Sequence, residues 1–113
     1  VIGSGHATHN LADWSRSDGT ELAYARRFAD WIAERIAQGD HRAIADYRDA
    51  QADGARAHPS EEHFVPLLLA WGAAAEDTKP QRFYQGIEGG ALSMDAYAFW
   101  PSDIVAPTPR FRT

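Results

Sequence analysis

The chain has 113 residues, is 44% hydrophobic, and carries a formal net charge of −5 with no cysteine. This composition suits one small globular domain and excludes a disulfide framework, a thiolate metal site and a basic nucleic-acid surface. An acidic surface disfavours docking on anionic lipid, and no apolar run approaches the roughly 20 residues that span a bilayer. Lack of cysteine fits a reducing compartment, so we expect a cytoplasmic protein that binds neither nucleic acid nor membrane.

The first residues have the pattern of a buried strand that enters a glycine loop. Residues 1–4 are expected to be the end of a strand, and residues 5–17 a loop or short helical turn. A strand this short needs neighbours to pair with, and Val1 is not an initiator methionine. We therefore expect the chain to be a piece of a longer protein.

The first clear helical pattern covers residues 21–38. Asp18 is a candidate N-cap, with Glu21 three residues later to complete a capping box. Gly39 supplies a C-terminal stop. Apolar residues recur at helical spacing and predict the buried face: Leu22, Ala25, Phe28, Ala29, Ile32 and Ile36.

A second helix is predicted near residues 40–50, capped by Asp40 and directing Ile44 and Tyr47 inward. Its pattern fades in the polar stretch 49–57.

A third helix is predicted near residues 60–72. Ser60 is the candidate cap, and the two glutamates that follow it suit the positive end of the helix dipole. Pro66 removes one helical hydrogen bond, so we expect a distorted first turn around His63. Four apolar residues are expected to face the core: Phe64, Leu67, Leu68 and Trp71.

The C-terminal third is predicted to form strands. Strands are expected near residues 82–87 and 91–99, with a glycine turn between them. Residues 101–113 contain three prolines and are expected to be a tail outside the domain of residues 1–100. The fold class is therefore α/β, with part of a sheet flanked by helices.

Five histidines are the candidate functional residues, because histidine is the usual acid/base at neutral pH and the commonest metal ligand. His6 and His9 lie on the glycine-rich loop after the first strand, where α/β sheets carry their ligands. His63 lies beside two glutamates, His58 precedes a proline, and His41 is expected to be solvated. Spacing alone leaves two readings open for His9 and His63: functional groups, or structural residues bonded to backbone or water.

Three segments carry a resemblance to a known family. Residues 2–11, IGSGHATHNL, resemble the "GSG…HNL" loop of class III extradiol ring-cleavage dioxygenases. Residues 58–68, HPSEEHFVPLL, are similar to the "HPTxEHxxPL" helix start of these enzymes. Residues 86–94, GIEGGALSM, look like the near-terminal "GSLSM" strand. Order and intervals also match, most closely to the DOPA 4,5-dioxygenase-like branch, related to the protocatechuate 4,5-dioxygenase catalytic subunit. The resemblance covers the chain to about residue 100, which is less than half of a family member.

The resemblance implies an enzyme that opens catechol-type rings with O2 at one non-haem Fe(II), with zinc possible in purified protein. By position, His63 carries over as a metal ligand and His9 as the acid/base that handles the catechol proton. The two other ligand histidines belong to the N-terminal half of the family, which this chain does not match. A ligand role for Glu62 is the minority alternative, and His58 is not assigned as a ligand.

Metal chemistry agrees with this division, because ring cleavage needs open positions for substrate and O2 beside about three protein ligands. Two alternatives from other functional classes stay open. One is a non-catalytic fragment or accessory domain of the same fold without a complete metal site. The other is a zinc-binding remnant that uses His63 and a neighbouring chain. A homo-oligomer is possible, and the sequence names neither the oligomer nor the diol.

Overall fold

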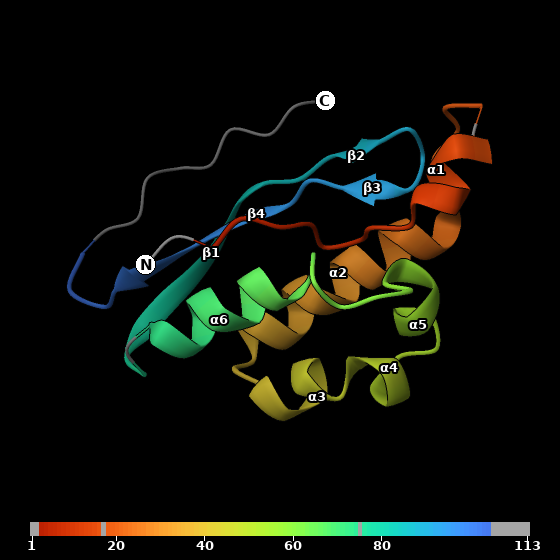
Figure 1. Ribbon diagram of the computed structural model, residues 1–113. Helices are drawn as coiled ribbons and strands as arrows, with labels where there is room; N and C mark the ends of the chain where they lie inside the picture. Colours follow the sequence, from red (N-terminus) through yellow and green to blue (C-terminus); the bar gives the residue numbers. More distant parts are fainter. Residues whose placement is uncertain (1–2, 17, 75, 105–113) are drawn as a thin grey trace.

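Six helices and four strands follow one another in the part of the chain that the computed structural model describes, residues 3–16, 18–74 and 76–104. This mixture confirms the predicted α/β class (Figure 1). The elements are α1 (Leu11–Arg16), α2 (Ala23–Ala37), α3 (His41–Ala45), α4 (Tyr47–Ala50), α5 (Gly54–Ala57), α6 (Val65–Ala73), β1 (Thr78–Tyr84), β2 (Ile87–Glu88), β3 (Leu92–Ser93) and β4 (Ala96–Pro101).

Helix α2 is the longest element and supplies much of the core. The predicted stripe is confirmed, since five of its residues are fully buried and Leu22 packs against them. The predicted stop is also confirmed: Gly39 has a positive φ of 69°, and the N–H groups of Gly39 and Asp40 bond back to the last turn. A left-handed residue at this position is tolerated best by glycine, which has no Cβ.

The start of α2 differs from the prediction. The helix begins at Ala23, and Leu22 stands at the N-cap without a side-chain bond. Asp18 instead accepts a hydrogen bond from the backbone N–H of Thr20 at 2.9 Å. The predicted cap and capping box at Asp18 and Glu21 are therefore wrong, because Asp18 closes a local turn ahead of the helix.

The predicted helix at 40–50 is two short helices, α3 and α4, separated at Asp46. The cap is confirmed, since the Asp40 carboxylate accepts from the N–H of Ala43 at 3.1 Å. Ile44 and Tyr47 are buried, as predicted. The polar stretch after them, expected to be irregular, contains the single turn α5.

Helix α6 begins five residues later than predicted. It starts at Val65, and Pro66 lies in its first turn. The expected conflict does not arise there, because the first N–H groups of a helix have no intrahelical acceptor. Ser60 is not the cap: its hydroxyl donates to the carboxylate of Glu62 at 2.8 Å. His63 therefore lies in the turn ahead of α6, while Phe64 and Trp71 are buried and the leucines partly buried, as predicted.

Each predicted C-terminal strand is two strands in the structure. Strand β1 pairs antiparallel with β4, with a register irregularity at Phe83, and β2 pairs antiparallel with β3. Gly3 and Ser4, expected to end a strand, are not in one, and Val1 and Ile2 lie outside the described residues. The expected tail starts inside β4, and its residues 105–113 also lie outside the described part.

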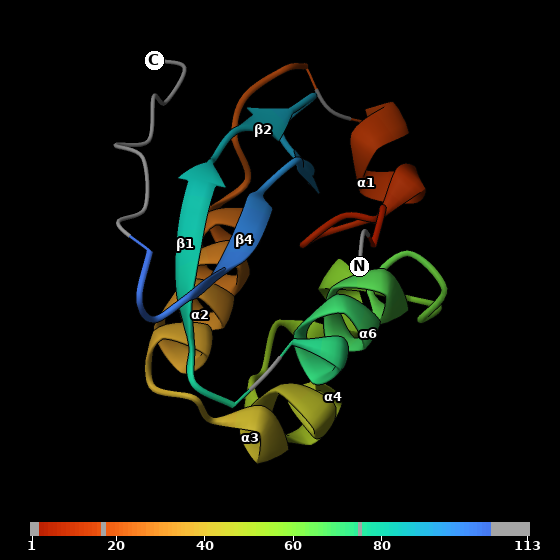
Figure 2. The ribbon, with the colours of Figure 1, turned by 90° about the vertical axis from the view of Figure 1, so that its left-hand side faces the viewer.

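The strands form a long ribbon on one side of the molecule, and the helices lie on the other (Figures 1 and 2). The segment before α1 runs between these two layers, with a single bridge from Thr8 to Ser93. Among the described helices, none has both the length and the apolar character needed to cross a bilayer. The functional candidates thus lie where an irregular N-terminal segment meets the start of α6.

Candidate metal centre

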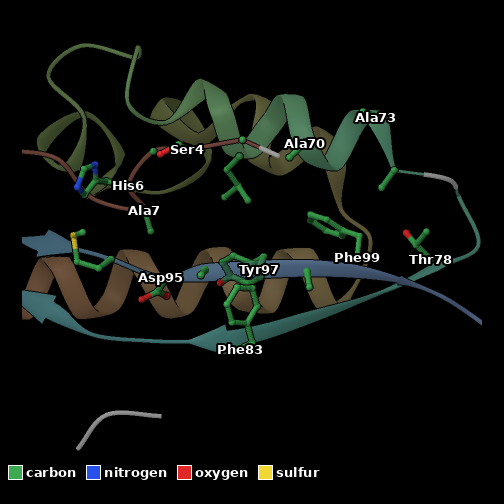
Figure 3. A pocket seen from close by; sticks show the side chains of 17 residues that line it. Ser4, His6, Ala7, Ala70, Ala73, Thr78, Phe83, Asp95, Tyr97 and Phe99 are labelled. Atoms are coloured by element: carbon green, nitrogen blue, oxygen red, sulfur yellow. The ribbon is translucent and has the colours of Figure 1, made fainter. Parts of the chain in front are cut away.

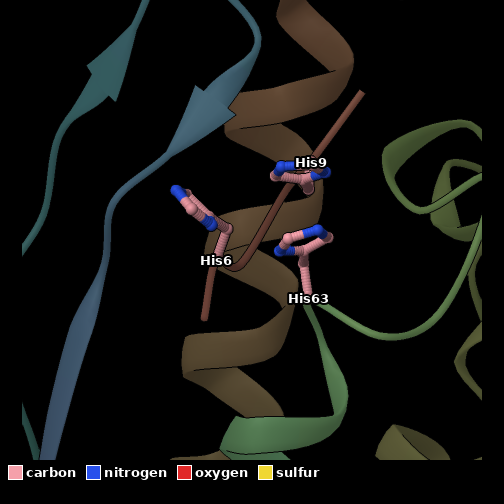
Figure 4. A group of neighbouring side chains, drawn as sticks. All are labelled: His6, His9 and His63. Atoms are coloured by element: carbon pink, nitrogen blue, oxygen red, sulfur yellow. The ribbon is translucent and has the colours of Figure 1, made fainter. Parts of the chain in front are cut away.

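Three histidines from two distant segments meet in space. His6 and His9 come from the N-terminal segment, and His63 comes from the turn ahead of α6 (Figure 4). Each offers a ring nitrogen, and these three atoms all lie within 4.8 Å of one another. All three side chains are half-buried. We call these residues the histidine cluster.

The backbones that carry the cluster are in direct contact. The N–H of His6 donates to the carbonyl of His63 at 2.8 Å. A Cβ added to Gly5 would lie 2.3 Å from that same carbonyl oxygen, and one added to Gly3 would lie 2.3 Å from the carbonyl of Pro66. The two glycines of the loop are therefore required for the close approach that brings His6 to His63.

His9 is fixed by its own backbone and by the buried residue before it. Its N–H donates to the carbonyl of Ala57 at 2.7 Å. Thr8 is fully buried, and its hydroxyl donates to the carbonyl of Ala91 at 2.6 Å and accepts from the N–H of Ser93 at 2.7 Å. These bonds tie His9 to both the helical layer and the β2–β3 ribbon.

Asn10 fixes His9 from the other side. Its side-chain amide donates to the carbonyl of Arg56 at 2.7 Å. Its side-chain oxygen accepts from the N–H of Asp13, and this bond caps the start of α1. Sequence reasoning gave Thr8 and Asn10 no role. The available signal was Asn10 itself, an N-cap residue type directly ahead of α1.

The ring pairs of the cluster have two different arrangements, one stacked and one tilted or edge-on. His9 and His63 are stacked, with centroids 3.6 Å apart and an interplanar angle of 15°. His6 is turned against both, at 52° to His9 and 67° to His63. Burial, and then the neighbouring His63, lower the pKa of the His6 and His9 imidazoles. Neutral imidazole is the form that binds a metal ion, so the site favours the required protonation state.

The two remaining histidines lie outside the cluster. His58 is fully buried, and its Nε2 donates to the carbonyl of Ala7 at 2.7 Å. His41 is exposed and stacks on Trp71 with ring centroids 3.7 Å apart. Glu62 is also exposed and is not one of the three grouped donors among the described residues.

A cavity of about 750 Å³ adjoins the cluster at His6. It runs between α6 and the β1–β4 ribbon, with His6 and Ser4 near one end and Phe99 and Thr78 at the other (Figure 3). Its walls include many small apolar residues, among them Ala70 and Ala73 of α6 and Ala96 and Ala98 of β4.

The two motifs that meet in the cluster belong to one family pattern. Residues 1–90 match the family described as the catalytic LigB subunit of aromatic ring-opening dioxygenase. The chain belongs to the LigB family. Both His9 and His63 lie within the matched residues, and so does His6.

Relatives of this LigB chain include 4,5-DOPA dioxygenase extradiol from Beta vulgaris, 31% identical over 99 residues that make up 88% of this chain and 37% of the relative. The Escherichia coli protein of the same name is 30% identical over 102 residues, covering 83% of this chain and 36% of that protein. The chain thus spans little more than a third of these relatives. The resemblance to class III extradiol dioxygenases of the DOPA branch is confirmed.

The fold agrees with this membership. The crystal structure of an uncharacterized Escherichia coli K12 protein superposes with a TM-score of 0.72 and 26% sequence identity. The match covers 83% of this chain and 40% of that protein.

Proposed function

We propose that the chain supplies one share of a non-haem Fe(II) centre that opens a catechol-type ring beside its diol with O2. The meeting of His9 and His63, from two separate family motifs, is the observation that carries this proposal. Catechol and O2 are the small-molecule partners, and a region outside this chain provides the other ligands. Zinc is the ion expected to compete for the site.

The donor set fits such an ion. Imidazole nitrogen suits both iron and zinc. The cluster offers three half-buried imidazoles, and burial lowers the pKa of His6 and His9 and so favours their neutral form. The buried Nδ1 of His6 has no hydrogen-bond partner among the described residues. An unpartnered buried nitrogen is costly, and a bound ion or substrate would remove that cost.

His63 is the proposed metal ligand. The bond from His6 and the turn that leads into α6 hold its backbone, so the Cα from which its side chain extends has a fixed position. With His63 and two ligands from outside the chain, open positions would remain for diol and O2. An ion held there would supply Lewis-acid chemistry that favours the ionised diol.

His9 is the proposed acid/base. A metal ion lies near the plane of the imidazole that binds it, and the planes of His9 and His63 are nearly parallel and separate. An ion in the plane of the His63 ring would therefore lie out of the plane of the His9 ring, which leaves His9 off the ion that His63 would bind. From there it can hold the proton of a bound diol, provided that its ring reaches hydrogen-bond distance of the oxygen.

The cavity beside His6 supports a small-molecule substrate. Its volume of about 750 Å³ lies in the range of ligand pockets, which are mostly apolar with a few polar groups. The flat ring of a catechol suits walls of alanine and aromatic side chains.

A chimera tests this function. In it, the chain replaces the segment of the Beta vulgaris 4,5-DOPA dioxygenase that it matches, so that the rest of that enzyme supplies the missing region. After anaerobic loading with Fe(II), addition of DOPA and O2 should give a yellow ring-opened product. The same protein without iron, and a His41→Ala variant with iron, are the controls, because His41 lies outside the cluster. A folded, iron-loaded chimera that converts none of a series of catechols would contradict the proposal.

A further inference from the structure

The strand motif of residues 86–94 has no part in the proposed function, although two of its residues bond to the side chain that precedes His9. We propose that Thr8 is a positioning residue: its hydroxyl, held between Ala91 and Ser93, fixes the place from which His9 acts as acid/base. The inference rests on the proposed function for the role of His9. It gives the third family motif a role in the site, which is to hold the acid/base through Thr8.

The Thr8 hydroxyl is bonded on both sides. It donates to the carbonyl of Ala91 at 2.6 Å and accepts from the N–H of Ser93 at 2.7 Å. All three residues are fully buried, so water does not compete for either bond. The N–H of Ala7 also donates to the carbonyl of Ser93 at 3.1 Å, and Thr8 forms a β-bridge with Ser93. The N-terminal segment is thus held in one register against the β2–β3 ribbon, directly ahead of His9.

The direction of the His9 side chain follows from that of Thr8. Consecutive side chains of an extended segment point to opposite sides, and the bridge to Ser93 makes the segment extended at Thr8. Thr8 points toward the ribbon, whereas the His9 ring stacks on that of His63, away from the strands (Figure 4). The N–H of His9 donates to the carbonyl of Ala57 at 2.7 Å. Fixing Thr8 therefore fixes the direction in which the His9 side chain leaves the backbone.

The exact place of His9 matters for its proposed role. A general acid/base must reach hydrogen-bond distance of the oxygen whose proton it holds. Misplacement by about 1 Å, caused by a change away from the reacting atoms, can lower a rate about 100-fold. Without the Thr8 hydroxyl, the Ala91 carbonyl and the Ser93 N–H would lose a buried partner, which is costly. We expect the segment to shift in response, and His9 to shift with it.

Iron content and turnover of DOPA by the chimera test the inference. Thr8→Val keeps the shape of the side chain and removes the hydroxyl, whereas Thr8→Ser keeps the hydroxyl. Thr20→Val is the control, because Thr20 is exposed and lies ahead of α2, outside the site. Thr8→Val should keep its iron and a KM within about threefold, while its kcat falls about 10–100-fold. Thr8→Ser and Thr20→Val should keep kcat within about threefold.

A double-mutant cycle separates the positioning of His9 from a general effect on the fold. Thr8→Val added to His9→Ala should lower kcat by less than about threefold, because the group that Thr8 positions is already absent. A general loss of stability would instead slow the double variant as much as it slows the unmodified chimera. Circular dichroism identifies a variant that does not fold, and Thr8→Ala then replaces Thr8→Val.

Several results would overturn the inference. Unchanged kcat in a folded Thr8→Val chimera would do so, and so would equal slowing by Thr8→Ser or Thr20→Val. A full further loss in the His9→Ala background would show that Thr8 has a structural role alone. If His9→Ala is slow while Thr8→Val is not, the inference fails and the proposed function stands. If His9→Ala keeps full turnover, the role of His9 in the proposed function fails as well.

Discussion

At the scale of single residues, the imidazoles of this chain have sharply different surroundings. His9 and His63 are half-buried and stacked on one another, whereas His58 is enclosed by the rings of Phe28, Tyr47 and Phe64. The same side chain is thus grouped with other possible metal donors in one case and packed among aromatic rings in the other. The difference lies in what each ring contacts.

His58 predicts a pH dependence of stability. Burial lowers its pKa to about 4, from 6.5 in the unfolded chain. Because the unfolded chain binds the proton more readily, the stabilisation is complete above pH 6.5 and is lost as the pH falls toward 4. The loss at pH 4 should be about 3 kcal/mol, at about 1.4 kcal/mol for each pH unit. Urea unfolding at pH 7 and pH 4 measures it.

The matched variant is His58→Gln, whose amide can donate to the carbonyl of Ala7 as Nε2 does. It should lose less stability than the unmodified chain between the two pH values, by about the same 3 kcal/mol. Equal losses in the two proteins would show that His58 is not the titrating group.

Among the histidines, the candidate site residues could be predicted from family motifs but not from their spacing in the sequence. His9 and His63 are far apart in the sequence, and spacing left each of them with a structural alternative. The family resemblance singled them out, and the structure brings them together. His6 was among the candidates but received no role, because no motif assigns one. The burial of His58 follows from long-range packing against Phe28 of α2, which no local pattern reports.

At the scale of elements, the decisive contact is that of the N-terminal segment with the turn ahead of α6. Gly5 lies against the carbonyl of His63, and the bond from His6 follows directly. This contact positions two members of the cluster at once.

Gly5→Ala should therefore destabilise the chain. Its Cβ would meet the backbone oxygen of His63 at 2.3 Å, and a backbone atom cannot rotate away as a flexible side chain can. Overpacking of this kind costs about 1–3 kcal/mol. Urea unfolding is the measurement.

Gly72→Ala is the control, because the new Cβ would meet nothing within 4 Å. Gly72 lies inside α6, where alanine should raise stability by about 0.5–1 kcal/mol. A neutral or stabilising Gly5→Ala would refute the close approach.

Elements with strong local signals were predicted well. The stripe and the glycine stop of α2 depend on the helical repeat and on one backbone conformation, both of which are local. The start of α6 was predicted too early because Ser60 and the glutamates after it resemble a helix start, whereas they form the turn that presents His63. The short turn α5 is polar and has no clear repeat, so its packing against α2 and α4 decides its conformation.

At the scale of the whole molecule, one arginine bonds to both the strand ribbon and the helical layer. Arg82 of β1 donates to Asp95, just ahead of β4, at 2.7 Å and to Asp30 of α2 at 3.0 Å. The Asp95 side chain is 1% exposed and also accepts from the hydroxyl of Ser93. This network holds the β1–β4 ribbon, which forms one wall of the cavity, against α2.

Arg82→Ala should lower the free energy of unfolding by about 3–5 kcal/mol, because it leaves the Asp95 carboxylate buried and unpaired. Arg27→Ala is the comparison, since it removes an arginine that is largely exposed in its pair with Asp53. It should lower stability far less. If urea unfolding shows that the two variants lose equal free energies of unfolding, burial of the Arg82–Asp95 pair is not what stabilises the contact between the ribbon and α2.

The central claim is that His63 binds the metal and His9 handles the proton. Iron content and product formation, measured side by side in the chimera for His63→Ala and His9→Ala, test it most directly. The account predicts that His63→Ala loses both iron and product. It predicts that His9→Ala keeps its iron and turns over about 10²–10⁴-fold more slowly, the usual loss on removal of a general acid/base. Loss of iron in His9→Ala, with iron and product retained in His63→Ala, would contradict it.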